Sequence, residues 1–234
     1  MLSETAEKAL EYYGGKELWQ NAKMLEADVS TTGLAFTLKR RPIFEHAKIV
    51  MEVDKPFVKL TPIGKNKNIT GVLDGNDVWL EDENGKIVAR REDVRKYFPN
   101  GRRFFYWDDM DMTYFANYAF WNYFTFPNLL MNEKIVWNEK EPGFLEAIFP
   151  DSLPTHSKFQ EFKIDMLTGK LLQHNYTVDV FGSWAHVANV VTEHKEENGI
   201  KYPSRRIVSP KIMNKILKKP VMIDITVHSF KLSN

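Results

Sequence analysis

The sequence predicts a mainly β protein: a curved antiparallel sheet, or unclosed β-barrel, with an N-terminal helix and a helical aromatic segment covering the concave face. Three observations predict it. Apolar and polar residues alternate along roughly a dozen short segments, as in half-buried antiparallel strands. Turn pairs such as Asp74-Gly75 and Asn84-Gly85 separate several of these segments. One stretch, Asp108–Phe126, breaks the alternation and has aromatic residues on every side.

The chain opens with helical signals. Ser3 is a good helix cap, and the apolar residues from Ala6 to Tyr13 follow at helical spacing. Gly14-Gly15 is expected to end this helix, because glycine accepts the left-handed conformation that follows a helix C-terminus. Lys16–Lys23 is expected to form a second short helical turn.

Period-two alternation then predicts the strands. Segments 25–30, 34–39 and 46–53 place apolar residues at every second position. Pro56 and Pro62 bracket Phe57–Thr61, which predicts a strand near a sheet edge, where proline is tolerated. Val78-Trp79-Leu80 lies between two hairpin turns. Later strands are expected at Lys134–Asn138, Gly143–Phe149, Phe159–Asp165, Lys170–Val180, His186–Lys195, Lys201–Val208 and Met222–Lys231.

No linker rich in glycine, serine or proline divides this succession, so residues 1–234 are expected to form one domain with a helical insert at about 108–130. Asp108, Asp109 and Asp111 favour a helix N-terminus through the helix dipole, and Pro127 ends or kinks the helix. A helix that is apolar all round must be buried or lie against lipid. We expect it to cover the concave face of the sheet.

Composition excludes several kinds of function. The chain has 234 residues and no cysteine, which rules out disulfides, thiol catalysis and cysteine zinc sites. With 32 Lys and Arg against 31 Asp and Glu, the net charge of +1 predicts no nucleic-acid partner. There is no uninterrupted apolar run of about 18 residues, so no transmembrane segment is expected. The first residues, MLSETAEKALEYYGG, lack signal-peptide features, which predicts a soluble, cytoplasmic protein, or a periplasmic one if a leader was removed.

Several segments, in the same order, resemble the periplasmic lipoprotein-carrier (LolA/LolB-like) superfamily. They are the opening helix with Gly14–Trp19 and the strand Met24–Thr32, the hairpin Ile164–Leu171, the turn Asn198–Pro203, and the closing strand Ile223–Leu232. The resemblance implies an unclosed antiparallel barrel whose open face is covered by helices. It also implies that acyl chains or other hydrophobic ligands are held between sheet and helices. The chain departs from the family in lacking a lipobox cysteine and in carrying the aromatic insert, so it is expected to form a separate branch.

Aromatic residues make up 13% of the chain, and many fall between Phe104 and Phe126. Large apolar pockets are lined this way, although such rings also fill ordinary cores. The predicted function is therefore binding of a hydrophobic small molecule or lipid-like ligand, with no cofactor. The expected ligand-binding residues are Trp107, Tyr114, Tyr118, Trp121, Asn122, His156, Tyr176 and His186. The sequence leaves the ligand's identity and the oligomeric state open.

An enzyme, such as an isomerase, cyclase or hydrolase, is the alternative, with Asp109, His156 and His186 as candidate proton-transfer residues. The competing interpretation of the aspartates is helix capping. No metal site is expected, because eight strand residues separate His186 from His194 by about 26 Å. A histidine–carboxylate pair at the pocket floor favours the enzyme, a pocket without titratable groups favours binding, and a filled core favours a structural or interaction domain.

Overall fold

The computed structural model describes residues 2–213 and 215–234, and within these ranges one antiparallel sheet of 14 strands is the main element of the fold. In the first half lie β1 (Met24–Thr32), β2 (Phe44–Glu52), β3 (Phe57–Thr61), β4 (Thr70–Asp74), β5 (Asp77–Glu81) and β6 (Ile87–Arg91). In the second half lie β7 (Val136–Glu141), β8 (Phe144–Ile148), β9 (Phe159–Ile164), β10 (Leu171–Thr177), β11 (His186–Glu197), β12 (Ile200–Ile212), β13 (Lys215–Ile216) and β14 (Ile223–Ser233).

The structure has one long helix and four short ones among the described residues. They are α1 (Glu4–Tyr12), α2 (Gly15–Asn21), α3 (Leu34–Leu38), the 16-residue α4 (Asp109–Phe124) and α5 (Phe126–Leu129), with single 3-10 turns at Val94–Tyr97 and Gly101–Phe104. The Ser3 side chain accepts a hydrogen bond from the Ala6 amide, as expected of the first cap. None of the described helices is long and apolar enough to cross a membrane.

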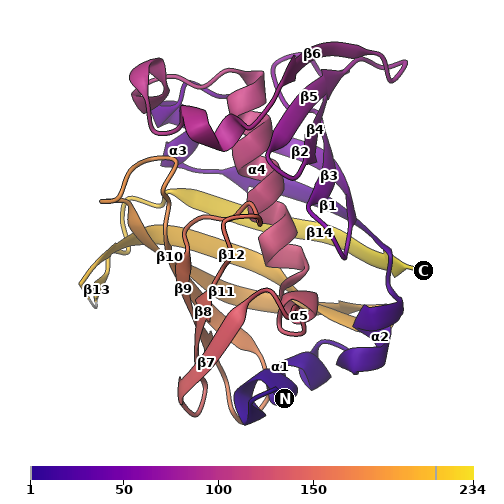
Figure 1. The fold of residues 1–234 in the computed structure, drawn as a ribbon, viewed down its shortest axis with the longest axis vertical. Helices are drawn as coiled ribbons and strands as arrows, with labels where there is room; N and C mark the ends of the chain where they lie inside the picture. The colour runs from indigo at the N-terminus through magenta and orange to yellow at the C-terminus, as the bar shows by residue number, and fades with distance from the viewer. Residues whose placement is uncertain (1, 214) are drawn as a thin grey trace.

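The strand order is β6-β5-β4-β3-β2-β1-β14-β12-β11-β10-β9-β8-β7, with β13 paired to β12. The first and last strands of the chain therefore pair at the middle of the sheet, with Leu25 opposite Leu232. The sheet curves around α4, which runs through its concave side, while α1 and α2 lie beside α5 (Figure 1). The predicted mainly β class and unclosed curved sheet are confirmed.

The aromatic insert is helical and buried, as predicted. Every residue from Asp111 to Phe124 is buried, because α4 has the sheet on several sides and the loop around Pro154 against it. Asn117 donates hydrogen bonds from Nδ2 to the carbonyl oxygens of Val58 (3.1 Å) and Gly71 (3.0 Å). At Gly71, an added Cβ would lie 2.4 Å from the Thr113 hydroxyl, so the close approach of α4 to β4 requires a glycine.

Two local predictions are wrong. The segment 34–39 was predicted to be a strand, but Leu34–Leu38 is the helix α3, because the Leu34 and Ala35 amides turn away from the sheet to bond the carbonyls of Val221 and Met222. The strand β3 was predicted near an edge, but it pairs with both β2 and β4. The prolines flank β3 and so remove no N–H group from its ladder. The edge strands are β6 and β7.

Candidate functional site

A largely apolar cavity of about 280 Å³ lies on the inner side of the sheet at one end of β10, β11 and β12. Ala35 of α3 and Phe115 of α4 cover it from the concave side, and Ile223 at the start of β14 closes another wall. The loop between β10 and β11 supplies Val178, Phe181, Trp184 and Ala185. Trp184 is 73% exposed and marks the outer rim of the cavity.

Three of the predicted ligand residues meet at this cavity. His156, from the loop before β9, and Tyr176, near the end of β10, are buried and stack with their ring centroids 3.9 Å apart. His186, at the start of β11, is exposed and hydrogen-bonds Thr177 through Nδ1 at 2.8 Å. The antiparallel topology brings them together because β10 pairs with both β9 and β11.

A buried polar network lies behind the two stacked rings. The His156 ring nitrogens contact the hydroxyl groups of Tyr118 (Nδ1, 3.3 Å) and Tyr123 (Nε2, 2.8 Å). The Tyr123 hydroxyl also bonds the hydroxyl of Tyr176. Neutral imidazole has one donor and one acceptor nitrogen, so His156 satisfies both tyrosines of α4 without carrying a charge.

Burial determines the protonation of this network. It lowers the pKa of His156 well below its ordinary value, and the nearby Arg95 cation lowers it further. Burial also raises the pKa of Tyr118 and of Tyr176 well above the usual value for tyrosine. All three groups are therefore neutral near pH 7. No carboxylate lines the cavity, so the histidine–carboxylate pair that an acid–base enzyme needs is absent from its described lining.

The other predicted residues of α4 and the preceding loop lie away from this cavity. Trp121 donates from Nε1 to the Glu52 carbonyl (3.0 Å), and Asn122 bonds the carbonyls of Tyr118 and Pro154. Tyr114 lines a separate, more polar cavity of about 260 Å³ that also contains Arg95 and Asp179. Trp107 borders a space of only about 10 Å³. The structure therefore uses most of the aromatic insert as core.

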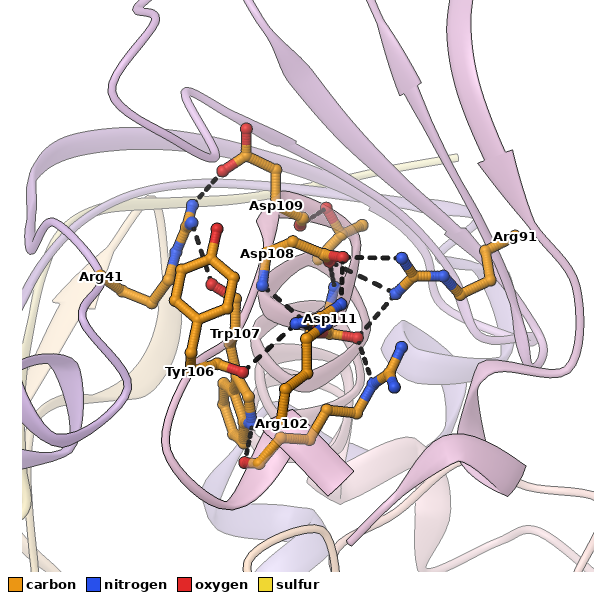
Figure 2. Close-up of polar contacts among 10 residues, drawn as sticks. Arg41, Arg91, Arg102, Tyr106, Trp107, Asp108, Asp109 and Asp111 are labelled. Atoms are coloured by element: carbon orange, nitrogen blue, oxygen red, sulfur yellow. Dashed lines mark hydrogen bonds and ion pairs between the residues drawn. The ribbon is translucent and has the colours of Figure 1, made fainter. Parts of the chain in front are cut away.

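Asp109 belongs to a cluster of ion pairs at the start of α4 (Figure 2). It pairs with Arg41, which also bonds the Trp107 carbonyl. Asp108 and Asp111 form a capping box, each accepting a hydrogen bond from the other's backbone amide. Asp111 is fully buried and pairs with Arg91, Arg102 and Arg103. Asp108 and Asp111 therefore act as capping groups and Asp109 as an ion-pair partner, and none of the three lines the cavity.

Sequence reasoning missed Phe115, Phe181 and Trp184 as lining residues. The signal available was the run Val180–Ala185, where aromatic residues flank Gly182 in a break between two strands. A larger groove of about 730 Å³, the outer groove, runs along β7 to β11. It is lined by charged residues such as Glu146 and Glu161, and it shares Tyr176, His186, Val187 and Lys211 with the cavity. Among the described residues, no group of three or more His, Asp or Glu side chains is placed to hold a metal ion.

Comparisons with known proteins connect this fold to one structural class. No family model matches the sequence, and no curated protein matches it. A LolA superfamily protein of Nitrosomonas europaea superposes with a TM-score of 0.52 at 12% identity, covering 100% of this chain and 94% of that one. A putative outer membrane lipoprotein-sorting protein domain of Vibrio parahaemolyticus gives 0.50 at 12% identity, covering 98% and 91%. The chain therefore has a LolA-like fold.

Proposed function

We propose that this protein binds a hydrophobic small molecule, or one lipid-like chain, in the cavity at the end of β10, β11 and β12. The observation that carries the proposal is the cavity's chemistry. Four parts of the chain supply apolar walls, Lys211 and His186 are the polar groups at the edge, and the floor has two polar rings whose hydrogen bonds are made elsewhere. Binding sites for apolar ligands combine a largely apolar lining with a few oriented polar groups.

The cavity's size limits the ligand. At about 280 Å³, it lies just below the roughly 300–1,000 Å³ that is typical of small-molecule pockets. A short aliphatic chain or a compact ring system therefore fits, and a longer chain must extend past Trp184 to solvent. The outer membrane lipoprotein-sorting domain named above has the same fold, which agrees with a hydrophobic ligand but does not identify one.

An enzyme working in the same cavity has less support. His156 is buried, neutral and without a carboxylate partner, so it is poorly placed to take up a proton near pH 7. His186 is exposed at the rim and hydrogen-bonded to Thr177. Asp109 is paired with Arg41 in the cluster at the start of α4. The three candidate catalytic residues therefore do not form one proton-transfer set.

The test is titration of the purified protein with a neutral, environment-sensitive fluorescent dye. Val178→Phe places a ring in the cavity and is expected to weaken dye binding about tenfold or more, which corresponds to about 1.4 kcal/mol. Val136→Phe is the matched control, because Val136 lines only the outer groove and is exposed. Equal loss in both variants, or no dye binding by the wild type, contradicts the proposal.

A further inference from the structure

Among the described residues, one buried arginine has no acidic partner. Arg206, on the inner face of β12, is 1% exposed. Its Nη2 donates to the Tyr123 carbonyl (3.1 Å), and its guanidinium carbon lies 5.0 Å from the centre of the Tyr123 ring. Its Nε and Nη1 groups have no hydrogen-bond partner within residues 2–213 and 215–234. Buried charges are normally paired, because an isolated one is costly to remove from water.

Two further polar side chains lie beside it. Asn189 of β11 is fully buried, and its side chain faces the hydroxyl groups of Tyr123 and Tyr176. The Ser204 hydroxyl, two residues from Arg206 on the same inner face of β12, has no hydrogen-bond partner among the described residues. In the β11–β12 ladder, Arg206 is opposite Val191 and Asn189 is opposite Val208, so the two polar side chains are diagonal neighbours.

These groups adjoin the proposed ligand cavity. Val187 and Val208 line the cavity. On β11, Val187 precedes Asn189 by two positions, and on β12, Val208 follows Arg206 by two positions. Each pair lies on one strand face, a step of about 7 Å. Tyr176 connects the two places, because its ring lines the cavity while its hydroxyl bonds Tyr123, the partner of Arg206. The titratable groups nearest the guanidinium are the hydroxyls of Tyr13, Tyr123 and Tyr176, with no carboxylate among them.

We propose that Arg206, with Asn189 and Ser204, binds the carboxylate of an anionic amphiphile whose apolar part lies in the cavity. This rests on the proposed function and adds the ligand's chemical class. A carboxylate matches the planar donor fork of arginine, and it supplies the negative charge that the core lacks. The polar head enters first, past Tyr176, and the chain points towards the rim at Trp184. The Ser204 hydroxyl and the Asn189 amide then donate further hydrogen bonds to the bound carboxylate.

The test compares a fluorescent polyene fatty acid with its methyl ester on the full chain. The wild type is expected to bind the acid at least about tenfold more tightly than the ester, the effect of one charge-assisted hydrogen bond. Arg206→Met is expected to bind both equally, with the affinity for the ester retained. Arg205→Met is the control: Arg205 is the next residue, points to the other face and pairs with Asp224, so the preference for the acid should persist.

The outcomes separate the two proposals. If the wild type binds acid and ester equally, or if Arg206→Met keeps the preference, the carboxylate site is refuted while hydrophobic binding stands. If neither compound binds the wild type, both proposals fail. Arg206→Lys keeps the charge but not the fork, and is expected to lose most of the preference. Without ligand, Arg206→Met should raise the denaturant midpoint, because removing an unpaired buried charge is favourable, whereas a purely structural arginine predicts a lower midpoint.

Discussion

In the ion-pair cluster at the start of α4, the Asp108 carboxylate both caps the helix and forms ion pairs, and two substitutions can distinguish these roles. Asp108 caps the helix through the Asp111 amide (2.8 Å) and pairs with Arg91 (2.7 Å) and Arg102 (Figure 2). Asparagine caps helices about as well as aspartate but carries no charge. Asp108→Asn therefore removes the ion pairs and keeps the cap, whereas Asp108→Ala removes both.

The size of the charge effect follows from the carboxyl group's titration. Burial alone would raise the pKa of Asp108, but Arg91 and the Asp111 amide lower it from 3.8 to about 2. At 1.36 kcal/mol for each pH unit, this corresponds to about 2.4 kcal/mol. Because the carboxylate is partly exposed, solvent screening reduces the expected loss in Asp108→Asn to about 1–2 kcal/mol. Asp108→Ala should lose about 1 kcal/mol more, the usual value of an N-cap.

Urea unfolding at pH 7 and at intervals down to pH 2 measures both effects. The folded pKa is lower than the unfolded one, so the stabilisation is complete above pH 4 and disappears as the pH falls towards 2. Wild type and Asp108→Asn should therefore differ at pH 7 and converge at pH 2. A constant difference across this range refutes the electrostatic argument, and equal stability of the Asn and Ala variants refutes the capping argument.

Two other predictions concern the packing of α4. Replacing Asn117 with Leu removes two buried hydrogen bonds to β3 and β4 and should lower the free energy of unfolding by about 2 kcal/mol, measured by urea titration. The same change at the exposed Asn138 should cost less than about 0.5 kcal/mol, and equal losses at the two sites would contradict the reasoning. Because burial holds the pKa of His156 well below 6.5, the folded protein resists protonation that the unfolded chain accepts, so stability should fall as the pH drops below about 6.5. His156→Phe should flatten this dependence between pH 6.5 and 5, and an unchanged slope would show that other groups produce it.

The sequence predicts most of the fold because burial here follows period-two alternation. In β1, Leu25, Ala27 and Val29 are buried, as their spacing indicates. The segment 34–38 fails this logic because it is too short to distinguish a strand from one helical turn. Its helix depends on carbonyl groups at 221 and 222, which lie far along the chain. The local spacing of apolar residues cannot predict hydrogen-bond partners that are this distant in the sequence.

The site is harder to predict than the fold. His156, Tyr176 and His186 were identified as polar groups near a pocket, and the pairing of β9, β10 and β11 brings them together. Arg206 was overlooked because its segment alternates Tyr202, Ser204, Arg206 and Val208, and an arginine in such a run is ordinarily taken to be exposed. Only the structure shows that this face lies under α4 and that no acidic side chain in the described part of the chain pairs with the guanidinium.

The position of α4 explains why the cavity lies at the end of the sheet. An unclosed sheet of this size encloses more space than its own side chains fill, and here α4 fills the middle with Tyr118, Trp121 and their neighbours, all fully buried. Among the described residues, one space remains between Phe115 and the ends of β11 and β12, and a second remains beside Tyr114 and Arg95. The helix thus reduces a wide concavity to small spaces, and the ligand that we propose for the first of them is expected to be short in its buried part, whatever its total length.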